Sequence, residues 1–308
     1  MLARSASALF QRPLHFQFVR AQWSTRYLAT STTSPKLLSP VTLAYKENPK
    51  PSPQKEARSQ PIVILHGLFG SKQNWGALSK ALATRLNTRV FALDLRNHGE
   101  SGHSQEHDYT NMANDVTCFL KEQNLEKPIV IGHSMGGKVA MYLALNHTPM
   151  DRVVVVDMAP AKVQLSAEFA KYVTIMKEIQ QAHVKKQSEA DNIMKKSVSD
   201  LSIRQFLLTN LKKDSAKDEY NFRIPIDVLG GKLENLGQFD FVPGQDKYEG
   251  KILIIKGDKS GYVRDKDTEL IKTFFPQVRI EGLDAGHWVH AEKPEEFLKL
   301  VTEFAVEK

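Results

Sequence analysis

One stretch, residues 128–141, constrains the fold of this 308-residue chain more than any other. It begins with an apolar, β-branched run at residues 129–131, continues into GHSMG at residues 132–136, and ends in a helix-forming pattern. This order predicts a strand, a sharp turn and a helix, and GHSMG fits G-x-S-x-G, in which a serine hydroxyl projects above a sheet. We therefore expect Ser134 to be a nucleophile and the Met135 N–H to donate to an oxyanion beside it.

Apolar runs and helix-forming segments alternate along most of the chain. Strands are predicted at residues 41–45, 61–65, 89–95, 128–131, 152–156, 251–255 and 278–281. Helices are predicted at residues 75–86, 109–123, 135–147 and 267–275, and from residue 294 onward. Such alternation with short connections predicts a doubly wound, mostly parallel sheet. Residues 161–248, called the cap below, show helical patterning and dense charge instead, and we expect them to form a helical insertion over the site.

Three polar residues follow predicted strand ends and should meet at the carboxyl edge of the sheet, where ligands bind in such folds. They are Ser134, Asp157 and His287. An imidazole must take the proton of a serine hydroxyl, and a carboxylate must hold that imidazole in the right tautomer. His287, in a glycine-flanked loop after the last strand, is the predicted base, and Asp157 is the predicted acid.

The acid has rivals in the sequence. Ser260 occupies the position after the penultimate strand that often carries the acid, and we expect it to supply a supporting hydrogen bond. Asp227 is the rival acid if the cap folds inward. Asp157 keeps the chain order serine, aspartate, histidine that suits this arrangement. Two further histidines, His133 and His290, are expected to have structural roles.

The loop HGLFGS at residues 66–71 follows the second predicted strand. Gly67 permits close approach of the backbone, which makes the Leu68 N–H the candidate second donor of the oxyanion hole. Phe69 is expected to line the acyl pocket. This loop alone is weak evidence for an oxyanion hole, because any strand-to-helix connection needs glycines. Its presence in the same chain as GHSMG makes the evidence stronger.

Charge separates a leader from the rest of the chain. Residues 1–40 contain no acid and carry Arg4, Arg12, Arg20, Arg26 and Lys36, which account for most of the net charge of +7. Together with abundant Ser, Thr and scattered apolar residues, this composition predicts a mitochondrial transit peptide or a disordered leader. A single α/β domain should follow at residues 41–308. Because the basic excess belongs to the leader, nucleic-acid binding is not expected.

Several other classes of protein are not expected either. No apolar run reaches membrane-spanning length, so we expect no integral membrane segment. The single cysteine, Cys118, cannot form an intramolecular disulfide and agrees with a reducing compartment. His98, His103 and His107 share one loop, but their spacing matches no helical pair of metal ligands. Neither a metal nor an organic cofactor is implied.

Five motifs together resemble the α/β-hydrolase superfamily. They are HGLFGS at residues 66–71, DLRNHG at 94–99, GHSMGG at 132–137, VDMAP at 156–160 and AGHW at 285–288. Over about residues 58–306 the chain is similar to the group that contains mitochondrial abhydrolase domain-containing protein 11, the fungal ethanol acetyltransferases and the YbfF-type esterases. The resemblance implies the α/β-hydrolase fold, a catalytic aspartate at Asp157 and mitochondrial residence. One branch of the group has an acid that resembles Asp227, which leaves that alternative open.

These residues predict acyl transfer through an acyl-enzyme on Ser134. Water as the second acceptor would give a carboxylesterase, thioesterase or lipase acting on short-chain esters or thioesters, and an alcohol would give an acyltransferase. The resemblance to ethanol acetyltransferases adds acetyl-CoA and an alcohol to the expected substrates. The competing hypothesis is a catalytically dispensable hydrolase scaffold that binds a mitochondrial protein partner.

Overall fold

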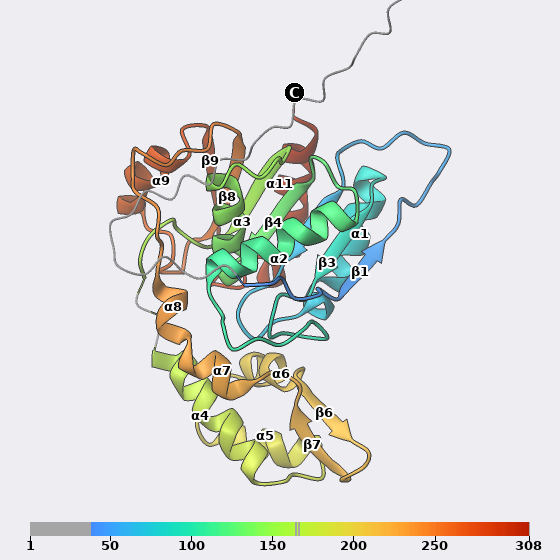
Figure 1. The fold of residues 1–308 in the computed structure, drawn as a ribbon, viewed down its shortest axis with the longest axis vertical. Coiled ribbons are helices and arrows are strands. Elements are labelled where there is room, and N and C mark those ends of the chain that lie inside the picture. Colours follow the sequence, from blue (N-terminus) through green and yellow to red (C-terminus); the bar gives the residue numbers. More distant parts are fainter. Residues whose placement is uncertain (1–37, 164, 166, 308) are drawn as a thin grey trace, which may run out of the picture. The chain divides into compact units, whose positions relative to one another are not determined.

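A sheet of seven strands forms the centre of the computed structural model, which describes residues 38–163, 165 and 167–307 (Figure 1). The strands are β1 (Tyr45–Asn48), β2 (Ile62–Leu65), β3 (Val90–Leu93), β4 (Ile129–His133), β5 (Arg152–Val156), β8 (Lys251–Gly257) and β9 (Val278–Leu283). Their spatial order is β1-β3-β2-β4-β5-β8-β9, and every pairing is parallel except that of β1 with β3. The predicted doubly wound, mostly parallel sheet is confirmed. Residues 1–37 of the predicted leader lie outside the described residues.

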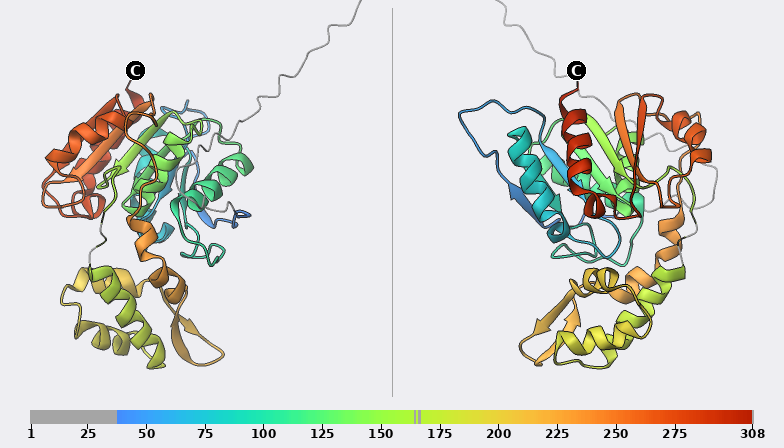
Figure 2. Two further views of the ribbon diagram at one scale, coloured as in Figure 1. Left: turned by 60° about the vertical axis from the view of Figure 1, so that its left-hand side comes forward. Right: turned by 180° about the vertical axis from the view of Figure 1, so that it is seen from behind.

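Alternate residues of the central strands face two different apolar layers. In β2, Val63 and Leu65 pack in one buried cluster with residues of α2 (Tyr109–Glu122) and α3 (Met135–Leu145). Ile62 and Ile64 pack in a second cluster with residues of α1 (Gly76–Leu86) and α11 (Pro294–Val306). Figure 1 shows α2 in front of the strands, and the rear view in Figure 2 brings α11 to the front. Because both faces are covered, the inner strands can be apolar throughout, which explains their continuous β-branched runs.

Short helices complete the core around these elements. They are η1 (Lys72–Trp75), η2 (Asp265–Asp267), α9 (Thr268–Phe274) and α10 (Val289–Glu292). In the part of the chain that the structure describes, no helix combines the length and the apolar character needed to cross a bilayer.

The first strand differs from its prediction at residues 41–45, because β1 begins only at the last of these residues. The segment before it is held by side chains of other elements and by two backbone hydrogen bonds, from Asp94 N–H to Ala44 O and from Gly102 N–H to Thr42 O. Val41 N–H, for example, donates to Asp115 Oδ1 at 2.9 Å. The apolar pattern correctly indicated burial, since Leu43 is 6% exposed. It did not reveal the hydrogen-bond partners, which are distant in the sequence and decide where strand pairing starts.

The cap lies between β5 and β8 in the chain. Its described helices are α4 (Ala167–Gln181), α5 (Gln187–Lys195), α6 (Leu201–Leu208), α7 (Ile226–Gly231) and α8 (Leu233–Gly237). An antiparallel hairpin, β6 (Leu211–Asp214) with β7 (Glu219–Phe222), was missed by the sequence prediction. Leu211 and Phe222 are buried, whereas Lys212 and Lys213 between them are exposed. Strands this short and this polar leave no apolar run to mark them.

Candidate active site

Ser134 occupies the turn between β4 and α3. Its φ of 52° and ψ of −114° lie in a region that a residue with a side chain adopts only when its surroundings enforce it, at about 1–3 kcal/mol of strain. The Ser134 N–H donates to Val156 O at 3.0 Å, and the Ser134 carbonyl accepts from Lys138 N–H at 3.1 Å. These bonds tie the turn to the neighbouring strand and to the following helix, so the strained geometry persists.

The glycines of GHSMG are required by close backbone contacts. A Cβ atom added to Gly132 would lie 2.1 Å from Gly136 O, and one added to Gly136 would lie 2.4 Å from Leu65 O. A protein interior has no free space into which a backbone oxygen could retreat from such a contact. The two glycines therefore let α3 start directly against β2 and β4, which fixes the position of the serine between them.

A hydrogen bond joins His287 to Asp157. His287 Nδ1 lies 2.7 Å from Asp157 Oδ2, and the imidazole is the donor, which leaves its Nε2 able to accept a proton. Asp157 is fully buried and accepts two more hydrogen bonds, from Gly257 N–H at 3.0 Å and from the Ser260 hydroxyl. The Tyr262 ring stacks on the imidazole, with 4.2 Å between centroids. The carboxylate and the imidazole are thus fixed in position and in orientation.

His133, the residue before Ser134, holds the loop that carries His287. Its Nε2 lies 2.9 Å from the His287 carbonyl and donates to it, and the two imidazole centroids are 4.8 Å apart. Burial lowers the pKa of His133 well below its usual range, so the ring stays neutral. The sequence predicted a structural role for His133 but did not predict this particular hydrogen bond. The bond places the turn of residue 134 beside the loop of residue 287.

The two candidate acids lie in different surroundings. Asp157 follows β5 and contacts His287, as described above. Asp227 lies on α7 of the cap, where its side chain is 89% exposed and pairs with Lys177 Nζ at 2.6 Å. Ser260 donates to Asp157, which is the supporting hydrogen bond predicted from the sequence. The structure therefore brings Asp157, and not Asp227, to the imidazole.

The predicted oxyanion donors lie at the ends of two adjacent strands. Among the described residues, the Leu68 N–H after β2 has no hydrogen-bond acceptor. Met135 is the first residue of α3, so its N–H is one of the unpaired donors with which a helix begins. Phe69 is buried, and its ring lies 6.2 Å from that of Phe169 in the cap, centroid to centroid. Phe69 therefore lies where the edge of the sheet meets the cap.

Buried polar side chains fix the loops after β2 and β3. His66 Nε2 accepts from Leu95 N–H at 2.9 Å, and Arg96 pairs with Asp115 at 2.6 Å in the interior. Burial lowers the pKa of both His66 and His98, so these imidazoles act as neutral hydrogen-bonding groups. Within the described ranges, no group of three or more His, Cys, Asp or Glu side chains is arranged to hold a metal ion.

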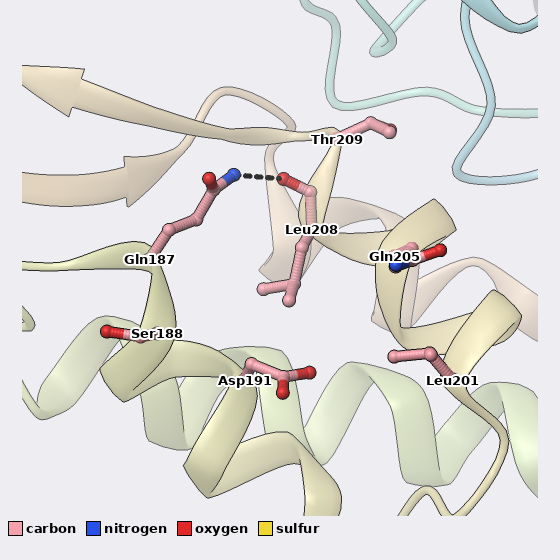
Figure 3. Close-up of a pocket in the computed structure, with 7 residues that line it drawn as sticks. All are labelled: Gln187, Ser188, Asp191, Leu201, Gln205, Leu208 and Thr209. Carbon is pink, nitrogen blue, oxygen red and sulfur yellow. Dashed lines mark hydrogen bonds between the residues drawn. The ribbon is translucent and has the colours of Figure 1, made fainter.

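A surface hollow of about 330 Å³ lies in the cap, between α5 and α6 (Figure 3). The residues that line it are Gln187, Ser188, Asp191, Leu201, Gln205, Leu208 and Thr209. All of them belong to the cap, and none is a predicted catalytic residue. This hollow is therefore separate from the constellation around Ser134.

A family model described as alpha/beta hydrolase fold matches residues 60–294, which include every strand of the large sheet except β1. The chain belongs to the α/β-hydrolase fold family. This finding confirms the resemblance that the sequence motifs indicated. In this α/β-hydrolase, Ser134, Asp157 and His287 follow strands β4, β5 and β9 at one edge of the sheet.

Known relatives agree with this family. The sn-1-specific diacylglycerol lipase ABHD11 of Danio rerio is 38% identical over 252 residues, which cover 80% of this chain and 78% of that protein. A probable alcohol acetyltransferase of Saccharomyces cerevisiae is 36% identical over 261 residues, covering 79% and 76%. The solved structure of a marine microorganism esterase is 32% identical, with a TM-score of 0.78, and covers 86% of this chain and 99% of that one. This α/β-hydrolase is an enzyme whose relatives include ester hydrolases and acetyltransferases.

We expect two aspartate variants to separate the candidate acids. In Asp157→Asn the amide can donate to the imidazole and so favours the wrong tautomer, which should lower kcat for p-nitrophenyl acetate by about 10⁴-fold. Asp227→Asn loses only an exposed ion pair with Lys177 and should change kcat by less than about twofold. Full activity in Asp157→Asn together with a large loss in Asp227→Asn would instead make Asp227 the acid.

We expect acid to destabilise this protein partly through His290. Burial lowers the pKa of His290 from 6.5 to about 3, and its ring stacks on Trp75 at 4.2 Å. Below pH 6.5 the His290 side chain binds a proton in the unfolded chain but not in the folded chain. The free energy of unfolding therefore falls as the pH falls. Between pH 7.5 and 5.5 this residue should account for about 1.4 kcal/mol of that fall.

The matched variants for this measurement are His290→Phe, which keeps a ring against Trp75, and His103→Phe at an exposed position. Urea unfolding at both pH values should show a smaller loss of stability in His290→Phe than in the unmodified protein. An equal loss of stability in all three proteins would contradict the contribution assigned to His290.

Proposed function

We propose that this α/β-hydrolase catalyses acyl transfer through a covalent acyl-enzyme on Ser134. The observation that carries the proposal is the bond between Asp157 and His287, at the same edge of the sheet as the strained turn of Ser134. His287 Nε2 takes the hydroxyl proton as Ser134 Oγ attacks the carbonyl carbon of an ester or thioester. The oxyanion forms beside the N–H groups of Leu68 and Met135. When the intermediate collapses, the leaving alkoxide or thiolate receives the proton from His287.

Asp157 assists this chemistry without taking the proton. As a buried acceptor of the Nδ1–H, it keeps Nε2 unprotonated before the attack and balances the positive charge of the imidazolium that forms afterwards. The bonds from Gly257 and Ser260 keep the carboxylate aimed at the ring. The second half-reaction reverses the first, with water or an alcohol as the nucleophile and His287 again as the base.

The acceptor distinguishes two activities that share the acyl-enzyme. We propose hydrolysis of small acyl esters or thioesters as the principal reaction, supported by the esterase and lipase among the similar proteins. Transfer of acetyl from acetyl-CoA to an alcohol is the second candidate, supported by the similarity to the yeast protein named a probable alcohol acetyltransferase. The two candidates differ only in the molecule that reaches the acyl-enzyme.

Product analysis should test both candidates. The purified protein is incubated with p-nitrophenyl acetate and with acetyl-CoA, each with and without ethanol, and acetate and ethyl acetate are measured. Ser134→Ala should lower acyl transfer by about 10⁴-fold or more while the protein remains folded. A fluorophosphonate probe should label the unmodified protein and not Ser134→Ala. No labelling of either protein, with no product, would favour the scaffold that binds a protein partner.

We also propose that the protein resides in mitochondria, on the basis of the basic, acid-free composition of residues 1–40. These residues, fused to a fluorescent protein, should direct it into mitochondria, whereas the chain without them should remain outside. A second fusion tests whether import depends on the positive charge. In it, Arg4, Arg12, Arg20 and Arg26 are changed to Gln. Import of the shortened chain would contradict the proposal.

A further inference from the structure

The peptide groups around Phe69 are held from two sides. Phe69 N–H donates to His98 Nε2 in the core at 3.0 Å, and its carbonyl accepts from Asn210 Nδ2 in the cap at 2.7 Å. Phe69 has a φ of 61°, an unfavourable value for a residue with a side chain, and is only 1% exposed. The two bonds explain how this backbone conformation is maintained beside Leu68, the proposed oxyanion donor.

Asn210 itself cannot swing away from this position. It follows α6 and precedes β6, its N–H donates to Leu207 O at 3.2 Å, and its carbonyl accepts from Arg223 N–H at 3.0 Å. The side chain is fully buried. Its Nδ2 faces two carbonyl oxygens, those of Phe69 and Leu207, so the orientation of the amide is determined by its neighbours.

The bond from Asn210 begins a chain of hydrogen bonds that ends at Leu68. The Phe69 carbonyl and the Gly70 N–H belong to one peptide group, and that N–H donates to Gly67 O at 2.9 Å. The Gly67 carbonyl and the Leu68 N–H belong to the next peptide group in this chain. Each hydrogen bond polarises the peptide that accepts it and strengthens the N–H on the other side of that peptide.

We propose that Asn210 is a positioning residue for the oxyanion hole. Resting on the function proposed above, this means that one amide of the cap fixes and polarises the peptides that present Leu68 N–H to the developing oxyanion. The cap thereby takes part in stabilising the transition state. Asn210 does this without touching the substrate.

Other bonds between cap and core allow this role to be separated from simple attachment of the cap. Lys232 Nζ pairs with Glu106 Oε2 at 2.8 Å, and neither residue belongs to the chain of peptides described above. Lys232→Met therefore loosens the cap and leaves the oxyanion loop untouched. It is the matched control for substitutions of Asn210.

The test compares p-nitrophenyl acetate with p-nitrophenyl thionoacetate, whose developing charge lies on sulfur and gains little from an oxyanion hole. In Asn210→Leu, which keeps the volume but cannot donate, kcat/KM for the oxygen ester should fall about tenfold, less than the 10²–10³-fold cost of losing a whole donor. The rate with the thionoester should change less than about twofold. The ratio of the two rates should therefore fall in Asn210→Leu and remain unchanged in Lys232→Met.

Asn210→Ala serves as a second variant if Asn210→Leu does not fold. It leaves room for a water molecule that restores part of the bond, so the ratio should fall in the same direction by a smaller factor. An unchanged ratio in the folded Asn210 variants would overturn the proposal, even if both rates were lower. Failure of the proposed acyl-transfer function would give a different result, because the unmodified protein would then hydrolyse neither ester.

Discussion

Parallel strand pairing that continues past the strand ends is the interaction on which the site depends. Ser134 N–H bonds to Val156 O at the end of the next strand, and Asp157 N–H bonds to Ile255 O in the strand after that. Both residues have a positive φ, of 52° and 50°. Each therefore turns sharply out of its strand while its backbone remains part of the ladder. The sheet in this way sets the spacing between Ser134 and Asp157 directly, without intervening loops.

Burial then determines the protonation of the groups around this edge. The imidazoles of His66, His98 and His133 are buried, their pKa values are lowered, and each carries one N–H that is used in the interior. As neutral groups they can donate and accept at once, so they connect loops that no regular structure connects. His287 differs from them because its Nδ1 partner is a carboxylate.

The parts of the structure that depend on the pattern of neighbouring residues in the chain could be predicted from the sequence. The sheet followed from continuous apolar runs, and the contact between Asp157 and His287 followed from the positions of these two residues after predicted strands. The start of β1 was misplaced because Val41 bonds to Asp115, a partner far along the chain. The hairpin β6–β7 was missed because its strands are short and charged. Asn210 carries no local signal at all: an asparagine between a helix and a strand is ordinary, and its importance comes from the Phe69 carbonyl that it meets in three dimensions.

The position of the cap in the chain has a consequence for how such enzymes diversify. It forms part of the connection between β5 and β8, which are parallel neighbours. Whatever its length, a connection between parallel strands has to run from the carboxyl end of the first strand to the amino end of the second. A longer, shorter or differently folded segment can occupy this crossover while every strand keeps its partner. The cap can therefore be exchanged as a module in evolution, provided that the replacement again supplies a donor to the loop after β2.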